Sequence, residues 1–402
     1  MPSSSPWHIA SYRRLWYGSV VLAMGSQFER LALGWLVLVE TDSVFLTAAA
    51  FAVQKAPGIL AAPIAGAVSD RISRGRMLTA TAFYKALIMG LLALLVLWGP
   101  GPIWMVFVLI ALSGVGMSFE LPAMQGLITD LTPKEMAMKA VAMQSTGNRA
   151  VGAVGSLAGG LIIAALGIPA ALFIGMGVNL IGAAIMATMP ALAYQHTTTR
   201  LSARRLLTDA VSGLTTLMRI PIIRTLLMIA FIVEMFAFAY TAVLPSLARD
   251  VLHVGVDGLG TLNMMASFGA LIGVAALTTW SSSVRNGLML IIVTIGFGLA
   301  LMIFASSDVF WLSLPLIMLV GAMAAVSDAL QWTMLQQHVP DDMRGRAIGG
   351  WVFVVGFGWM GQVALGAAAE AFGVPWALGG AGVLVLVTGL AALGFAGKLR
   401  AE

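Results

Sequence analysis

The sequence contains no cysteine, and only 10% of its 402 residues are charged. The missing cysteine excludes disulfide bonds, thiolate metal sites and thiol redox chemistry. Four histidines are present without a helical pairing that could hold a metal ion, so no metal centre is expected. The Gly-Lys pair at 397–398 is followed by leucine rather than Ser or Thr and belongs to no phosphate-binding loop, which argues against ATP hydrolysis. No cofactor is expected.

The scarcity of charge is matched by an excess of apolar residues. About a quarter of the residues of a soluble domain are charged, whereas this chain is 60% hydrophobic. A helix that crosses the bilayer takes ~20 residues, or ~30 with a connection, so the length allows about twelve or thirteen spans. We therefore expect an all-α integral membrane protein with the lipid bilayer as its surroundings.

Apolar runs bounded by charges, proline or glycine predict twelve transmembrane helices. They lie near 15–39, 45–69, 77–98, 103–129, 141–165, 168–189, 222–247, 256–280, 287–306, 310–336, 347–369 and 374–396. If Arg13 and Arg14 hold the amino terminus in the cytoplasm, 17 of the 22 basic residues fall on the cytoplasmic side. Both termini are then cytoplasmic, at the inner or plasma membrane. The net charge of +5 reflects this topology, and no nucleic-acid partner is expected.

The spans divide into two halves joined by one long polar connection. The predicted division is a first six-helix bundle at 1–190, a cytoplasmic linker at 191–221 and a second six-helix bundle at 222–402. Sliding the halves past each other by 207 residues matches Pro133 to Pro340 and Met136 to Met343. This match falls between the fourth and fifth spans of each half, as a parallel repeat requires. We infer a duplicated bundle.

The loop between the second and third spans reads GAVSDRISRGR at 66–76 and resembles the signature of the major facilitator superfamily. The matching residues are Gly66, Asp70, Arg71 and Arg74, whereas Ser73 and Gly75 depart from the pattern. The resemblance implies two six-helix bundles around a central cavity, with alternating access. It also implies that the matching residues form a conformational latch. The alternative is a positively charged loop with an acid that ends a helix.

Three further stretches resemble the exporters of drugs and siderophores within this superfamily. They read SYRRLWYGS at 11–19, GNRAVGAVGSLAGG at 147–160 and LQQHVPDDMRGRAIG at 335–349. In the second stretch, Gly155, Gly159 and Gly160 match a glycine element of antiporters, with Ser156 in place of its proline. The alternative interpretation, which does not depend on the family, is that these glycines permit close packing of transmembrane helices.

Four acidic residues fall within the spans, away from their ends. They are Glu29, Glu120, Glu234 and Asp328, on the first, fourth, seventh and tenth spans. The family resemblance implies that these four helices line the cavity. An ionised side chain facing lipid at mid-membrane costs about 2.5–3.5 kcal/mol on insertion scales. The four acids are therefore expected to face a wet cavity or one another.

A carboxyl group in such a site loses hydration, while a nearby cation favours its charged form, so helix motion can change its proton affinity. Glu29 and Glu120 are the leading candidates for carrying protons, with Arg30 and Arg149 tuning them. Glu234 and Asp328 would supply further proton sites or substrate contacts. The alternative is that these acids form fixed ion pairs between helices. Lys85, also within a span, is expected to snorkel towards the membrane surface, and the alternative is that it contacts an anionic substrate.

Aromatic and methionine residues on the same helices suit an amphipathic or lipophilic solute, although they also suit ordinary helix contacts. The predicted cavity residues are Phe28, Trp35, Met117, Phe236, Tyr240 and Trp332. The expected function is proton-coupled export of small molecules such as drugs or siderophores by a monomer. The alternatives are an importer or uniporter on the same scaffold, and a membrane-embedded sensor or enzyme. Catalysis is not expected, because no nucleophile is clustered with a base.

Overall fold

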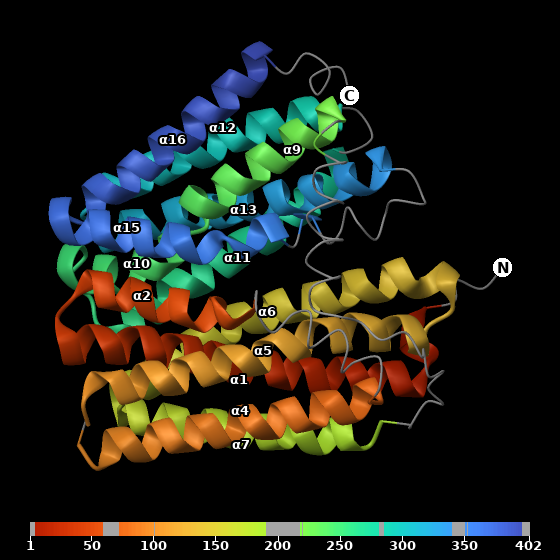
Figure 1. The fold of residues 1–402 in the computed structure, drawn as a ribbon, viewed down its shortest axis with the longest axis vertical. Helices are drawn as coiled ribbons and strands as arrows, with labels where there is room; N and C mark the ends of the chain where they lie inside the picture. Colours follow the sequence, from red (N-terminus) through yellow and green to blue (C-terminus); the bar gives the residue numbers. More distant parts are fainter. Residues whose placement is uncertain are drawn as a thin grey trace. The chain divides into compact units, whose positions relative to one another are not determined.

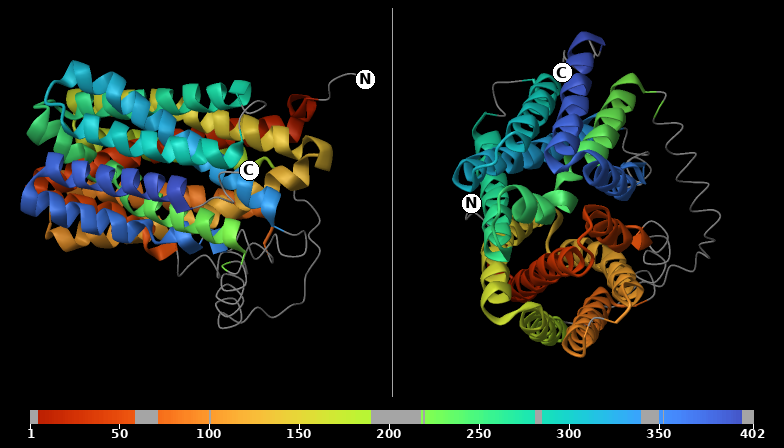
Figure 2. Two further views of the ribbon diagram at one scale, coloured as in Figure 1. Left: turned by 90° about the horizontal axis from the view of Figure 1, so that it is seen from above. Right: turned by 90° about the vertical axis from the view of Figure 1, so that its left-hand side faces the viewer.

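A computed structural model describes residues 5–58, 72–99, 101–189, 218, 220–280, 285–339, 350, 351 and 353–395. The described helices group into two compact units (Figure 1). Unit 1 comprises Met1–Glu40 and Val53–Leu201. Its helices are α1 (Ala10–Thr41), α4 (Arg74–Leu97), α5 (Ile103–Leu131), α6 (Lys134–Leu166) and α7 (Ile168–Ala187), preceded by the short η1 (Pro6–His8). The right-hand view of Figure 2 shows these helices, red to yellow-green, end-on as a bundle.

Unit 2 comprises Thr41–Ala52 and Ser202–Glu402, and it includes most of α2 (Val44–Lys55). Its other helices are α9 (Pro221–Ile232), η2 (Val233–Ala237), α10 (Tyr240–Ser246), η3 (Leu247–Val251), α11 (Val256–Trp280), α12 (Asn286–Ala305), α13 (Phe310–His338), α15 (Gly358–Phe372) and α16 (Val374–Phe395). The segments α9 to η3 form one apolar stretch over Pro221–Val251. Within it, η2 and η3 are π-helical, which widens the helix locally.

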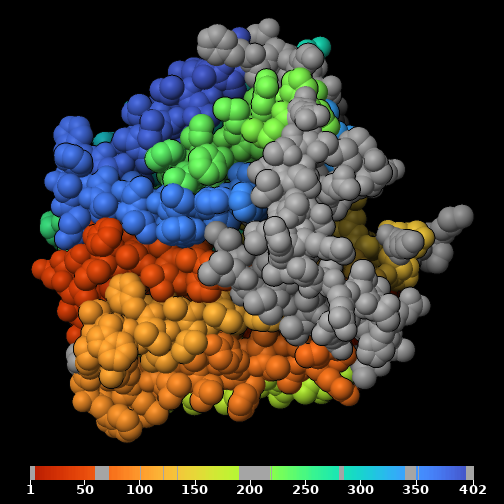
Figure 3. All heavy atoms as spheres, viewed as in Figure 1, coloured from red at the N-terminus to blue at the C-terminus, as the bar shows by residue number. Residues whose placement is uncertain are grey.

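The described residues include eleven helices that are long and apolar enough to cross a membrane, and α2 adds a shorter apolar helix. The twelve predicted spans therefore each coincide with a helix, although residues 59–69 of the second span and residues 347–349 and 352 of the eleventh lie outside the described residues. Large apolar side chains cover the outer faces of α4 and α5, orange in Figure 3, among them Phe83, Leu87 and Trp104. Such faces are stable against lipid rather than water. The fold is the twelve-helix, all-α membrane fold that the sequence predicts.

Two pairs of glycines confirm that the units are built alike. Gly167 ends α6 and Gly373 ends α15, each with a positive φ (84° and 88°) that only glycine adopts without strain. Gly114 of α5 and Gly321 of α13 are separated by the predicted offset of 207 residues. At each, an added Cβ would overlap a carbonyl oxygen of the neighbouring α2 or α11. The repeat thus preserves turns and close helix crossings as well as sequence.

The turn between α1 and α2 belongs with unit 2. The Arg249 guanidinium pairs with Asp42 at 2.7 Å, and the Phe45 backbone N–H donates to Glu370 Oε2 at 2.9 Å. A carboxylate at the first turn of a helix satisfies an otherwise unpaired N–H and interacts favourably with the helix dipole. Nearly all of the predicted linker at 191–221 lies outside the described residues, so the bundle boundaries stay a prediction.

Candidate functional site

The strongest concentration of buried charge in the described part of unit 1 surrounds Lys85. This residue lies halfway along α4 and is 2% exposed. Its Nζ donates to Ser26 Oγ of α1 at 2.7 Å and pairs with Glu120 Oε2 of α5 at 3.1 Å. The Glu120 side chain is 23% exposed, whereas that of Lys85 is 2% exposed. Solvent therefore reaches the carboxylate of this ion pair but not the ammonium group.

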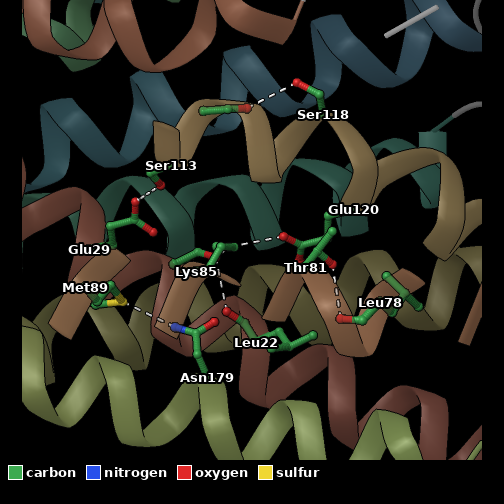
Figure 4. A network of polar contacts seen from close by, with 12 residues as sticks. Leu22, Glu29, Leu78, Thr81, Lys85, Met89, Ser113, Ser118, Glu120 and Asn179 are labelled. Atoms are coloured by element: carbon green, nitrogen blue, oxygen red, sulfur yellow. Dashed lines mark hydrogen bonds and ion pairs between the residues drawn. The ribbon is translucent and has the colours of Figure 1, made fainter. Parts of the chain in front are cut away.

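Glu29 forms the second half of the same network (Figure 4). The residue is 2% exposed on α1, and its Oε1 accepts hydrogen bonds from Gln54 Nε2 of α2 at 3.1 Å and from Ser113 Oγ of α5. The Lys85 side chain lies between Glu29 and Glu120 (Figure 4). The structure therefore brings together the two acids that the sequence singles out as proton carriers.

The expectation that Lys85 snorkels is wrong. Lys85 lies eleven residues after Arg74, so about 16 Å of helix separates it from the start of α4. Its side chain is 2% exposed, and its ammonium group is stabilised by Ser26 and Glu120 rather than by water at a membrane surface. The same count along the sequence could have identified Lys85 as a member of the site. Ser26, Gln54 and Ser113 carry no comparable signal, because polar uncharged residues are common in transmembrane helices.

The other two intramembrane acids lie in unit 2. Glu234 belongs to the π-helical segment η2 and packs against α15, where a Cβ added to Gly358 would lie 2.8 Å from its Cγ. Asp328 is half-buried on α13. A π-helical turn is frequent at functional sites. The roles of Glu234 and Asp328, and of the half-buried Arg30 and Arg149 in tuning the carboxyl groups, stay predictions.

The glycine-rich stretch at 147–160 lies on α6 and packs against α1. A Cβ on Gly147 would come within 2.9 Å of the Trp16 ring, and one on Gly159 would come within 2.9 Å of Phe28. Trp16 Nε1 also donates to the Met143 carbonyl oxygen at 3.2 Å. These contacts match the packing interpretation of the glycines. An antiport role for them stays a prediction.

Of the residues predicted to form a latch, the structure describes Arg74. Its Nη1 pairs with Asp130 Oδ2 of α5 at 2.7 Å, and Gly126 leaves room for its guanidinium. Gly66, Asp70 and Arg71 lie outside the described residues. Both partners of the ion pair are partly exposed, so this pair joins two helix ends near a surface.

The predicted cavity residues occupy varied surroundings. Phe236 borders an apolar hollow of about 670 Å³ between η2, α15 and α16, together with Leu365, Phe372 and Trp376. The remaining five divide by burial. Phe28 and Tyr240 are buried, Trp35 and Trp332 are half-buried, and Met117 is 44% exposed. Phe28 is held between glycines of α6 and α7, and Trp332 stacks edge-to-face on Trp351 with ring centres 5.2 Å apart. Their contribution to a substrate cavity stays a prediction.

The model of the transmembrane secretion effector family matches residues 2–401, nearly the whole chain. The chain belongs to this family of major facilitator transporters. Its resemblance to the drug and siderophore exporters is thereby confirmed at the level of the family, and the protein is an integral membrane transporter.

Among curated proteins, the transporter is similar to enterobactin exporters. It is 33% identical over 115 residues to enterobactin exporter EntS of Citrobacter koseri, which covers 29% of this chain and 27% of that protein. It is 31% identical over 145 residues to EntS of Escherichia coli O1:K1, which covers 36% and 34%. The matched stretch thus spans between about a quarter and a third of the length of these relatives.

Solved transporters share the fold over nearly their full length. The peptide transporter POT and the nucleoside transporter NupG each superpose with a TM-score of 0.75 at 13% identity. POT covers 99% of both chains, and NupG covers 96% of this chain and 98% of its own. At such low identity the likeness shows the fold alone.

Proposed function

We propose that this transporter exports small amphipathic or lipophilic molecules in exchange for protons, by alternating access between its two bundles. The observation that carries the proposal is the Lys85, Glu120 and Glu29 network in the interior of unit 1. Ionisable groups at this depth are costly in a membrane and generally serve ion or substrate movement. A carboxyl group takes up or releases a proton without other chemistry, so the network contains what proton coupling needs.

The repeat supports a functional rather than a packing role for this network. In unit 2 the helix that corresponds to α4 is α12, and Asn286–Ala305 contains no ionisable residue. At the repeat offset, Val320 stands where unit 1 has Ser113, and both side chains are buried. The helix of unit 2 that corresponds to α4 therefore packs without an ionisable residue. Helix packing alone does not call for the charged network in the other half.

The proposed substrates include siderophores of the enterobactin kind. The partial match to enterobactin exporters supports this choice, and it also supports export over import. Aromatic and methionine side chains on the predicted cavity helices suit an amphipathic or lipophilic solute. The proton-driven step would use Glu29 and Glu120, with Glu234 and Asp328 contributing in unit 2.

Purified protein in liposomes tests the proposal with enterobactin as the probe. Under exchange with protons, an acidic interior drives enterobactin inward, and Glu29→Gln and Glu120→Gln abolish the part of uptake that depends on the pH gradient. Glu135→Gln is the matched control, because this exposed acid on α6 lies outside the network. Full gradient dependence in both network variants would contradict the role of these acids.

The direction of the pH gradient that drives uptake distinguishes export from the importer and uniporter alternatives. Accumulation driven by an acidic exterior would indicate an importer that moves protons and solute together. Uptake that ignores the gradient would indicate a uniporter. In either case the export mechanism proposed above would be wrong.

A further inference from the structure

Lys85 is surrounded by more carboxyl groups than it can neutralise. Its Nζ contacts Ser26 and Glu120, while Glu29 lies on its other side (Figure 4). The helices packed against α4 add no further charge beside it in the described residues. In particular, α7 packs against α4 and contains no ionisable residue. Tyr84, which precedes Lys85 on α4, donates its hydroxyl hydrogen to the Leu112 carbonyl oxygen. One cation therefore faces two carboxyl groups.

This count sets the proton content of the network. With both carboxyl groups ionised, the network would hold a net negative charge in the membrane interior, which desolvation disfavours strongly. One proton restores neutrality. Both hydrogen bonds described at Glu29 are accepted by Oε1, so a proton on Oε2 leaves them intact. In the arrangement observed, Glu120 is the ionised partner of Lys85, and Glu29 is the carboxyl group that carries the proton.

We propose that Lys85 is the positioning residue that holds this network at one exchangeable proton, by pairing with whichever of Glu120 and Glu29 is ionised. The proposal rests on the proton-coupled function above and deepens it. When Glu120 takes a proton from water, an O–H bond forms on its carboxylate and its ion pair with Lys85 is lost. The ammonium group then turns on its flexible stem to Glu29, and the Glu29 proton leaves to water once helix motion opens this carboxyl group, which is 2% exposed in the arrangement observed. The net charge of the network is then unchanged, and the network carries its proton on Glu120 rather than on Glu29.

Infrared difference spectroscopy of the purified protein tests this without any substrate. A protonated carboxyl group gives a C=O stretching band that a carboxylate lacks. In the wild type one network carboxyl contributes to this band at neutral pH. In Lys85→Met both carboxyls must be protonated for neutrality, so the contribution of the network should increase about twofold. Lys85→Arg keeps the cation and should retain the wild-type band.

Two further variants test whether a change in the band arises from the charge of the network or from a general disturbance of the structure. Lys85→Met combined with Glu120→Gln removes both charges of the ion pair, so the protein stays neutral and the wild-type band of Glu29 should persist. Lys139→Met removes an exposed lysine of α6 and should leave the spectrum unchanged. A loss of the acid band in the double variant would overturn the proposal. An unchanged band in a folded Lys85→Met protein would also overturn it.

The two proposals fail separately. Because the spectra need no transported molecule, a protein that ignores the pH gradient during transport would disprove proton-coupled export and leave the role of Lys85 in holding the proton standing. Conversely, proton-driven transport could be equally strong in wild type and in Lys85→Met. This result would support proton-coupled export and disprove the proposed role of Lys85.

Discussion

Removing Lys85 alone should destabilise the transporter more than removing Lys85 and Glu120 together. In the wild type the ammonium and carboxylate groups lie 3.1 Å apart, with 2% and 23% of their side chains exposed. Breaking a buried ion pair by deleting one partner costs about 3–5 kcal/mol, because the remaining charge is left without compensation. Since Glu120 keeps some access to water, we expect the lower end of that range, about 3 kcal/mol, for Lys85→Met.

The double variant Lys85→Met/Glu120→Gln replaces the pair by uncharged groups of similar size. Such replacements of buried ion pairs are often neutral, so most of the loss should be recovered. The loss in Lys85→Met alone should then exceed the loss in the double variant by about 2–3 kcal/mol, so the two single losses should not add. Ser26 Oγ also loses the hydrogen bond that it accepts from Lys85 and keeps the one that it donates to the Leu22 carbonyl oxygen, which accounts for a residual destabilisation.

Equilibrium unfolding in mixed micelles, titrated with sodium dodecyl sulfate and followed by fluorescence, measures these differences, since the chain has 11 tryptophans. The titration is run at neutral and at alkaline pH. The same cycle on the exposed Glu135 and Lys139 of α6 is the control and should give less than about 0.5 kcal/mol. Additive losses at Lys85 and Glu120 would show that the two groups do not interact, and the charge argument would fail.

Two further predictions concern the fold. Gly321→Ala should destabilise unit 2 by about 1–3 kcal/mol, because its Cβ would overlap the Ala266 carbonyl oxygen, whereas Gly177→Ala should not, since nothing lies within 4 Å of its Cβ; equal unfolding midpoints would contradict the close crossing. Glu370→Ala should cost about 0.5–1 kcal/mol through loss of the bond from the Phe45 N–H, and the difference from wild type should shrink in high salt; a salt-independent loss would exclude the electrostatic part.

Much of the fold could be predicted because hydropathy and charge act locally. Each run of apolar residues between charges formed a helix, and the turns at Gly167 and Gly373 follow from glycine in a conformation that other residues avoid. The duplication was visible in a short stretch of matching residues. The π-helical turns of η2 and η3 were not predicted, because the apolar run over Pro221–Val251 reads as one continuous helix.

The candidate site was also predictable only in part from the sequence. Depth along each helix follows from residue number alone, so the sequence by itself placed Glu29 and Glu120 in the membrane interior and required them to have partners. The identity of those partners was decided by tertiary structure. Whether Lys85 faces lipid, water or a carboxylate depends on the rotation of α4 about its axis and on which helices lie beside it. Those quantities arise from contacts between residues 35 to 59 positions apart, and a single sequence does not specify them.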